Sequence, residues 1–350
     1  MKYLSLFSGI GGFELGIQQA YENNRKLLQG KKATDIRENS TDNKSRQNGV
    51  TCIGYSEIDK YAIQVYKKHF NHKNYGDITT IDPKELPDFD LIVGGFPCQS
   101  FSIAGKRGGF SDTRGTLFFD IVRIIREKQP RLLLLENVKG LLSHDQGRTF
   151  YTIISTLNEV GYDLQWQVLN SKNHGVPQNR ERVFIVGHLR GTSRPEVFPI
   201  GEDDQLSNGQ DVSKERQPQA EISTTVRDGM GNKADSTFVN VKEATKKGYA
   251  EANEGDSINL SVPNSKTRRG RVGKGIAQTL DTGMQQHTLK DAKIRRLTPT
   301  ECERLQGFPN GWTEGVSDTQ RYKCLGNAVT VNVIQAIMEK LYKIFNIKKI

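Results

Sequence analysis

The stretch Gly94-Gly95-Phe96-Pro97-Cys98-Gln99-Ser100-Phe101-Ser102-Ile103-Ala104-Gly105 decides how this chain is interpreted. It follows the apolar run 90–93, which is typical of a short buried strand. Two glycines end that strand, and a proline stiffens the turn that presents Cys98. Open α/β sheets bind ligands at the carboxyl ends of parallel strands. A free cysteine can also be an inert buried side chain, but polar residues and further glycines follow this one, as in a movable lid. We therefore predict that Cys98 is a nucleophile.

Strands and helices alternate on both sides of this stretch. Apolar periodicity predicts helices over residues 13–21, 60–69, 116–128 and 149–160, and strands over 3–7, 51–56, 131–135, 164–169 and 183–186. Residues 76–78 are expected to end a further strand. This alternation predicts an α/β fold with a doubly wound, mostly parallel, Rossmann-like sheet.

The alternation divides the chain into parts. We assign residues 1–190 and 325–350 to a catalytic domain, residues 191–295 to a smaller irregular domain with strand-like pieces at 223–226 and 276–280, and residues 296–324 to a connecting segment. Residues 24–49 are highly charged, which predicts a flexible and tolerated insert. Thr298-Pro299 is expected to open a short helix, and an apolar stripe over 327–345 predicts a helix that packs on the first domain.

Composition limits the class of protein. The 350 residues carry a net charge of +10, which suits a polyanionic partner such as nucleic acid. No run approaches the roughly 18 apolar residues of a membrane span, and no secretory segment opens the chain. The four cysteines are spaced neither as a disulfide framework nor as a zinc site. We expect a cytoplasmic monomer that needs no membrane and no metal.

The turn Gly9-Ile10-Gly11-Gly12 lies between a predicted strand and a predicted helix, where a backbone can approach a nucleotide-like ligand. No Gly-Lys-Ser/Thr follows, and Glu14 replaces the third glycine of the dinucleotide fingerprint. Glu57 ends the next strand. Once the insert is left out, its distance from Gly9 is close to the roughly 20 residues expected for a ribose-binding acid. We predict an adenosine ligand without a pyrophosphate.

Two more groups of polar residues lie at strand ends. Glu136-Asn137-Val138 ends the strand expected beside that of Cys98, so the thiol and the carboxylate can face one pocket, although such an acid can also cap the next segment. Arg180 and Arg182 precede another strand. They can be surface charges, or they can bind a carbonyl oxygen or a phosphate.

Together these segments resemble the DNA (cytosine-5) methyltransferases of bacterial restriction-modification systems. Six segments occur in the family's order, and residues 191–293 fall where that family has its variable target-recognition region. The segments are residues 7–13, 94–105, 136–138, 178–183, 296–309 and 326–333.

The resemblance implies a mechanism. Cys98 attacks C6 of a cytosine flipped out of double-stranded DNA, while Glu136 bonds N3 and the exocyclic amine. Arg182 contacts the ring carbonyl, and we place Arg180 in the same catalytic set. C5 then takes a methyl group from S-adenosyl-L-methionine, and loss of a proton and of Cys98 releases 5-methylcytosine. Covalent addition is needed because C5 is otherwise a poor nucleophile, and flipping is needed because a duplex hides the base.

The resemblance also marks binding residues. Ile58 departs from the family, whose members often carry an aromatic residue there that stacks on adenine. The expected cofactor-binding residues are Phe7, Gly9, Ile10, Gly11, Gly12, Glu57, Ile58, Asp77, Ile78, Pro97, Leu117, Asn327 and Ala328. A basic, glycine-containing loop over residues 266–274 suits DNA contact, because arginine is the usual reader of guanine. The expected DNA-binding residues are Gln99, Ser102, Arg268, Arg269, Arg271 and Lys274.

Three other interpretations compete with this one. A zinc cytosine deaminase needs His-x-Glu and Pro-Cys-x-x-Cys; no histidine here has that glutamate, and Phe101 occupies the second cysteine position. An RNA cytosine-5 methyltransferase on the same fold and a non-catalytic DNA-binding regulator stay open, although a regulator would be expected to lose Cys98 or Glu136. A separately encoded restriction endonuclease can accompany such an enzyme without forming a complex with it.

Overall fold

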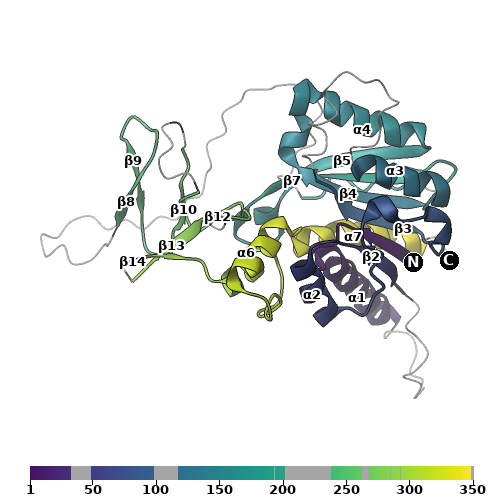
Figure 1. The fold of residues 1–350 in the computed structure, drawn as a ribbon, viewed down its shortest axis with the longest axis horizontal. Coiled ribbons are helices and arrows are strands. Elements are labelled where there is room, and N and C mark those ends of the chain that lie inside the picture. Colours follow the sequence, from purple (N-terminus) through teal and green to yellow (C-terminus); the bar gives the residue numbers. More distant parts are fainter. Residues whose placement is uncertain are drawn as a thin grey trace, which may run out of the picture.

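The computed structural model describes residues 1–32, 49–97, 117–192, 194–201, 238–261, 267, 269–283, 285–291 and 293–347. The chain forms a large lobe around a six-stranded sheet and a small lobe of short strands (Figure 1). Four residues singled out from the sequence, Cys98, Gln99, Ser102 and Arg268, lie outside the described residues, as do residues 33–48 of the expected insert and the strand-like piece at 223–226.

The large sheet has the strand order β2-β1-β3-β4-β7-β5. Strands β1 to β4 pair in parallel, and β7 runs antiparallel to both β4 and β5. The predicted doubly wound, mostly parallel sheet is therefore confirmed. In chain order the strands are β1 (Lys2–Leu6), β2 (Thr51–Ser56), β3 (Leu91–Gly95), β4 (Leu132–Val138), β5 (Tyr162–Asn170) and β7 (Glu181–Leu189).

Helices cover both faces of this sheet because alternate strand residues enter two different apolar cores. On one face α1 (Gly12–Lys32) and α7 (Val331–Ile347) pack on Tyr3, Leu91 and Leu132. On the other face α3 (Leu117–Lys128) and α4 (Arg148–Glu159) pack on Leu4, Ile92 and Leu133. The short helices are η1 (Ile78–Thr80), η2 (Pro83–Glu85), η4 (Lys139–Leu142), η5 (His144–Gly147) and η6 (Ser171–His174).

A third apolar core lies where the two lobes meet. It contains residues of α2 (Lys60–His69), of α5 (Pro299–Leu305) and of α6 (Asp318–Asn327). Helix α5 begins with the expected proline, and a capping box between Thr298 and Glu301 stabilises its start.

Three expectations differ from the structure. Helix α1 continues to Lys32 because it packs along α7, where Asn23 donates to Glu339, so the start of the expected insert is helical. Residues 76–78 do not end a strand; Asp77 instead caps η1 by accepting the Thr79 N–H. Residues 194–201 pack on the large sheet through Val197 and its neighbours, so the large lobe extends beyond the predicted boundary at residue 190.

The small lobe contains β8 (Val239–Lys242), which pairs with β9 (Tyr249–Ala252), and a four-stranded sheet in the order β11-β10-β13-β14. Within the described part of this lobe, the apolar core has four buried members, Val241, Ala252, Ile258 and Leu289. The strands of the four-stranded sheet are β10 (Ser257–Asn259), β11 (Val272–Gly273), β13 (Gln286–Lys290) and β14 (Lys293–Arg296).

A short strand joins the two lobes. Strand β12 (Ala277–Gln278), expected within residues 276–280, pairs in parallel with β6 (Gln178–Asn179), which directly precedes β7 of the large sheet. Within the ranges that the structure describes, no helix is both long and apolar enough to cross a membrane.

Candidate active site

The end of β3 faces Glu136 on β4. Gly95 pairs with Glu136 in the parallel register, and a Cβ atom on Gly95 would lie 3.0 Å from the Glu136 Oε2 atom. A glycine at this position therefore leaves room for the carboxylate. Because Pro97 and then Cys98 follow in the sequence, the chain leaves the sheet beside this carboxylate.

Asn137 fixes the chain just before Pro97. Its side-chain amide donates to the carbonyl of Phe96 at 2.9 Å, and its own oxygen accepts the Val138 N–H at 2.8 Å. The side chain is buried, so this bond is shielded from water. The sequence placed Asn137 in a motif but gave it no role; an amide at the end of a strand beside the cysteine strand was the only available clue.

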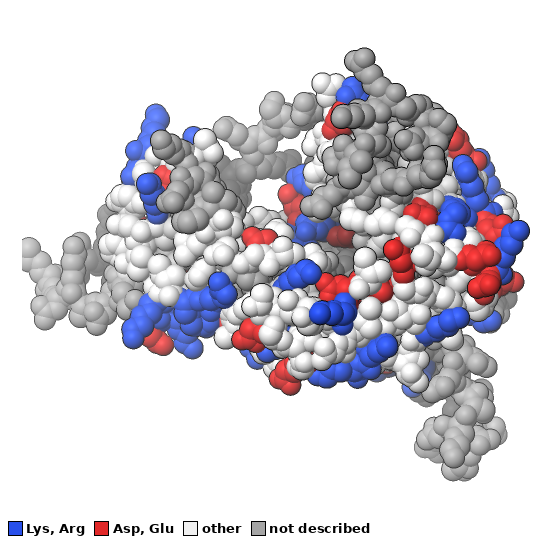
Figure 2. Space-filling model, in the orientation of Figure 1, with Lys and Arg blue, Asp and Glu red and all other residues white. Residues whose placement is uncertain are grey.

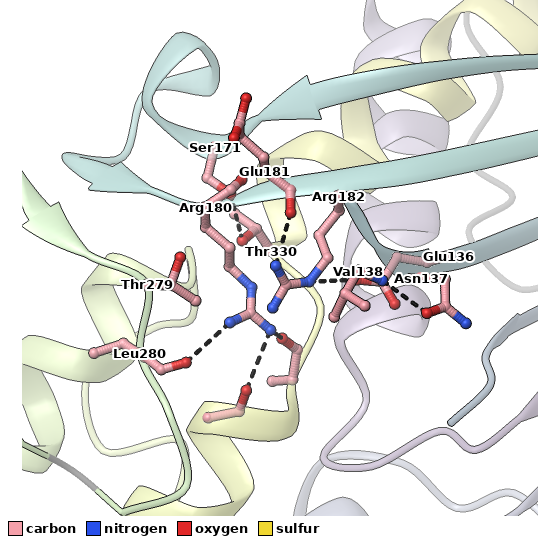
Figure 3. A network of polar contacts seen from close by, with 12 residues as sticks. Glu136, Asn137, Val138, Ser171, Arg180, Glu181, Arg182, Thr279, Leu280 and Thr330 are labelled. Carbon is pink, nitrogen blue, oxygen red and sulfur yellow. Dashed lines mark hydrogen bonds and ion pairs between the residues drawn. The ribbon is translucent and has the colours of Figure 1, made fainter. Parts of the chain in front are cut away.

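Glu136 and Arg182 form an ion pair. The Arg182 Nε atom lies 3.0 Å from Glu136 Oε1, and the two side chains are 14% and 12% exposed (Figure 3). Antiparallel pairing of β4 with β7 places Val138 opposite Arg182, and the Arg182 Nη1 atom also donates to the Glu181 carbonyl at 2.7 Å. Two residues expected to act together are thus in direct contact.

Arg180 has different partners from Arg182. It is 3% exposed, and it donates to the carbonyls of Leu280, Gly326 and Ala328 at 3.1, 3.2 and 2.8 Å (Figure 3). Burial lowers its pKa to about 9. Both of its Nη atoms bind backbone oxygens, so Arg180 holds distant segments together, and its place in the catalytic set stays a prediction. Its guanidinium joins the small lobe, the end of α6 and the start of the large sheet's β7.

A buried amide network surrounds Arg180. Gln178 accepts the Leu280 N–H and donates to the Leu305 carbonyl. Gln306 donates to the Leu325 carbonyl and accepts the Thr330 hydroxyl at 2.8 Å. Every side chain of this network is buried. Sequence reasoning missed Gln306 and Thr330, since nothing in their local sequence indicates contact with β6.

The glycine turn after β1 is braced from several sides. Glu57 Oε2 accepts the Gly9 N–H at 2.9 Å, while Gly9 has a positive φ of 55° and open space where a Cβ would lie. The Trp312 indole donates to the Ile10 carbonyl at 2.9 Å. Gly12 packs so closely that a Cβ would lie 2.8 Å from a methyl group of Val329. The turn therefore requires glycine at these two positions for different reasons.

The other expected cofactor residues differ in how far their side chains are exposed to solvent. Glu57 Oε1 accepts the N–H groups of Ile58 and Asp59, and the Ile58 side chain is 72% exposed beside it. Asn74 donates to the Glu57 carbonyl and accepts the Gly76 N–H, which brings the segment of Asp77 to the end of β2. Phe7 has a positive φ of 53°. Ile78 and Ala328 are buried, Leu117 is half-buried, and Asp77, Pro97 and Asn327 are exposed.

The basic residues expected at DNA have unequal positions. Arg269 is exposed and its Nε atom donates to the Ala244 carbonyl. Lys274 pairs with Asp256 at 2.6 Å. Arg271 is 1% exposed, which corrects its expected place on an exposed loop. Its carbonyl accepts the Asn259 N–H of β10 at 2.8 Å, and Glu243 accepts the Arg271 backbone N–H at 2.6 Å. Lys and Arg side chains also gather along the lower edge of the small lobe, below β13 and β14 (Figure 2).

Comparisons with known proteins place this geometry in a family. The family profile for C-5 cytosine-specific DNA methylase matches residues 1–343. The type II methyltransferase M1.ScrFI of Lactococcus lactis subsp. cremoris is 39% identical over 99% of this chain and 79% of its own length. The type II methyltransferase M.HhaI of Haemophilus parahaemolyticus is 33% identical over 99% of this chain and 96% of its own.

Solved structures show the same fold at lower identity. The Dnmt2 methyltransferase of S. pombe superimposes with a TM-score of 0.59 at 18% identity, covering 99% of each chain. The family profile spans nearly the whole sequence, and the curated relatives are type II methyltransferases. The chain therefore belongs to the C-5 cytosine-specific DNA methylase family and is a DNA (cytosine-5) methyltransferase of the restriction-modification type.

Proposed function

We propose that the enzyme methylates C5 of a flipped-out cytosine in a specific double-stranded DNA sequence, through a covalent bond between Cys98 and C6. The observation that carries this proposal is the Glu136–Arg182 pair at the end of β4, opposite Gly95 and next to the chain that leads to Cys98. A nucleophile, an acid and an arginine are the three groups that addition to a cytosine ring requires.

The ion pair supports different roles for the two oxygens of the Glu136 carboxylate. Arg182 Nε binds Oε1, while Oε2 is the oxygen that faces Gly95. Oε2 is thus the atom suited to N3 of the base, and a proton shared between them draws electron density from C6. The Cys98 thiolate then adds to C6, and the electron pair released into the ring makes C5 nucleophilic. Arg182 is positioned to contact the ring carbonyl while it holds the carboxylate in place.

Completion of the reaction returns the cysteine. After C5 is methylated, it loses its proton to a base, the C5–C6 double bond forms again, and the Cys98 sulfur leaves C6. The same thiolate is then available for another cytosine. Asn137 is a positioning residue in this scheme, because its amide holds the Phe96 carbonyl and so fixes where the cysteine segment leaves the sheet.

The residues around the glycine turn fit S-adenosylmethionine. This cofactor supplies an electrophilic methyl group. Glu57 is already anchored by three backbone N–H groups at the end of β2, so its carboxylate is held where it can accept ribose hydroxyls. The open space beside Gly9 and the exposed Ile58 side chain suit the adenosine portion. Asp77, Asn327 and Ala328 are expected to complete the site, together with Phe7, Pro97, Leu117 and the N–H of Ile78.

The small lobe is expected to select the DNA sequence. Arg269 and Lys274 are the described basic residues of the 266–274 loop with exposed side chains, and Gln99, Ser102 and Arg268 stay expectations from the sequence. Phosphate contacts would fix the register of the DNA, and contacts with base edges would choose the site. A separately encoded restriction endonuclease of the same specificity is expected to act without binding this enzyme.

Bisulfite sequencing of DNA from cells that express the protein tests this proposal. We expect protected cytosines at one recurring sequence with the wild type and none with Cys98→Ser. Purified protein should transfer labelled methyl from S-adenosylmethionine to the same site. If RNA were methylated and DNA were not, the result would favour an RNA cytosine-5 methyltransferase. If no methyl group were transferred to either, the result would favour a non-catalytic DNA-binding regulator.

A further inference from the structure

A cavity of about 530 Å³ lies between the four-stranded sheet of the small lobe and helix α5. Its walls come from β10, β13 and β14, from Pro177 before β6, and from α5. None of its lining residues belongs to the Glu136 site or to the expected cofactor site. The volume is in the range of pockets that hold small organic ligands.

The inner wall of this cavity, called the junction cavity below, is apolar. Leu289, Leu297 and Leu305 line it, and each of them is buried. Leu289 belongs to the small-lobe core, whereas Leu297 and Leu305 belong to the core where the lobes meet. The Leu289 side chain points into the small-lobe core, on the face of the sheet opposite Ser257, so the apolar body of a ligand would lie against Leu297 and Leu305.

One buried hydroxyl in the wall lacks a partner. Ser257 on β10 is 7% exposed, and its Oγ atom has no hydrogen-bond partner among the described residues. Leaving a buried hydroxyl unsatisfied costs free energy, so buried polar groups are nearly always bonded. A polar atom of a ligand in the junction cavity would satisfy it.

The rim carries positive charge that is available for binding. Arg295 is already neutralised by Glu301, with contacts of 2.7 and 2.9 Å, and Glu254 accepts the Asp291 N–H at 2.9 Å. The side chain of Lys290, at the end of β13, is exposed and makes no hydrogen bond or ion pair with any described residue. Arg304 adds a second cation, of which Nε alone is engaged, by Asn310. The hairpin of β13 and β14 borders the basic lower edge of the small lobe (Figure 2).

We propose that the junction cavity binds a small organic anion with a flat apolar body, of the class of aromatic carboxylates. The apolar part lies against Leu297 and Leu305, a polar atom meets the Ser257 hydroxyl, and the anionic group pairs with the Lys290 ammonium. The occupied cavity fixes the small-lobe sheet against α5, and it therefore stabilises the junction of the two lobes by mass action.

Titration of the full-length protein with 2-naphthoate tests this site, followed by calorimetry and by thermal unfolding. Neutral 2-naphthalenemethanol has a similar ring system without the charge and serves as the ligand control. We expect 2-naphthoate to bind and to raise the midpoint of unfolding, and the alcohol to bind at least about tenfold more weakly, because a charge-assisted hydrogen bond is lost.

Three variants test whether 2-naphthoate binds in the junction cavity. Lys290→Ala should weaken 2-naphthoate binding about tenfold, whereas Lys246→Ala, an exposed small-lobe lysine outside the cavity, should not change it. Ser257→Phe should fill the cavity and abolish binding. Because Lys290 is exposed, Lys290→Ala should fold, and it therefore still tests the site if Ser257→Phe does not fold. Equal binding of acid and alcohol, equal effects of the two lysine changes, or no binding of 2-naphthoate to the wild type would each overturn the proposal.

Discussion

The two lobes differ in what holds them together. Two extensive apolar cores enclose the large sheet, whereas four buried apolar residues form the core of the small lobe among the residues that the structure describes. A fully buried apolar side chain contributes about 1.5–3 kcal/mol, so this described part of the small lobe gains far less from apolar burial. It relies on polar contacts instead, such as those of Glu243 and Asp256, and on the network of Gln178 and Arg180 at the junction. The candidate active site thus lies on the lobe with the larger apolar cores, and the small lobe is attached to it by a buried hydrogen-bond network beside the third apolar core.

The largest effect is expected at Cys98. Cys98→Ser should lower the single-turnover rate of methyl transfer by more than about 10³-fold, because a serine hydroxyl is a far weaker nucleophile than a thiolate. DNA binding should persist, and DNA containing 5-fluorocytosine should trap the wild type covalently. Cys52→Ala serves as the control. Near-wild-type rates in Cys98→Ser would contradict the covalent mechanism.

A smaller loss of rate is expected at Glu136. Glutamine keeps the shape of the side chain but cannot share a proton with N3, and loss of such a contact costs roughly 10²–10⁴ in rate. The matched control is Glu181→Gln, because Glu181 pairs with Lys139 at the surface. Single-turnover rates within a few-fold of the wild type would refute the role assigned to Glu136.

The junction itself is tested at Arg180. Arg180→Ala removes the arginine donor from the carbonyls of Leu280, Gly326 and Ala328, and we expect the free energy of unfolding to fall by about 4 kcal/mol. Urea unfolding measures this loss, and limited proteolysis should show earlier cleavage in the small lobe. Arg190→Ala, which removes a surface pair with Asp163, is the control. If both variants were equally stable, the hydrogen-bond network would not be what attaches the small lobe.

Glu14 is a buried, pH-sensitive group of the large lobe. Burial raises the pKa of Glu14 to about 7, against partial opposition from hydrogen bonds that include Tyr66. The native state therefore keeps this proton between about pH 4.5 and 7, where the unfolded chain has lost it, and stability falls as pH rises through that window. The pKa difference corresponds to about 3 kcal/mol.

Glu14→Gln should remove this contribution. We expect urea unfolding to give the variant a flatter stability profile between pH 5 and 8, with its largest advantage over the wild type at pH 8. Glu22→Gln changes an exposed residue of the same helix and should keep the wild-type profile. Identical slopes for Glu14→Gln and the wild type would show that Glu14 does not titrate in this range.

The smallest effect is expected for residues 33–48. Replacing them by a short Gly/Ser linker, with α1 kept through Lys32, should leave S-adenosylmethionine affinity within about twofold of the wild type, since loop closure depends weakly on length. Equilibrium binding measures this. A large loss of affinity would mean that the segment contributes to the cofactor site.

The sequence predicted those elements whose limits are set by neighbouring residues. The helix over residues 60–69 was predicted with its observed limits, because Asp59 caps it and its apolar residues recur at helical spacing. The site was predicted as far as neighbouring parallel strands bring Gly95 and Glu136 together. The contact of Arg182 with Glu136 depends on the antiparallel strand β7, whose partner cannot be read from its own residues.

The sequence did not reveal the partners of residues that contact distant parts of the chain. Arg180 and Arg182 stand in one short motif, yet backbone carbonyls from two distant segments bind the first and a carboxylate binds the second. Arg271 lies in a basic, glycine-rich stretch that looks exposed, and its burial comes from packing in the small lobe. In both cases the decisive partner is about 30 or more residues away in the chain.

The bond from Trp312 to the Ile10 carbonyl bears on how such enzymes can be recombined. Trp312 lies beyond the small lobe in the sequence, yet it supports the glycine turn, and it stacks on His69 with ring centroids 3.6 Å apart. Tyr322 likewise donates to the Leu297 carbonyl. A chimera that exchanges recognition regions between relatives should therefore join after β14, near Arg296. Residues from Leu297 onward then come from the same parent as the lobe that carries Gly9. A junction placed further downstream would combine Trp312 of one parent with the glycine turn of the other parent.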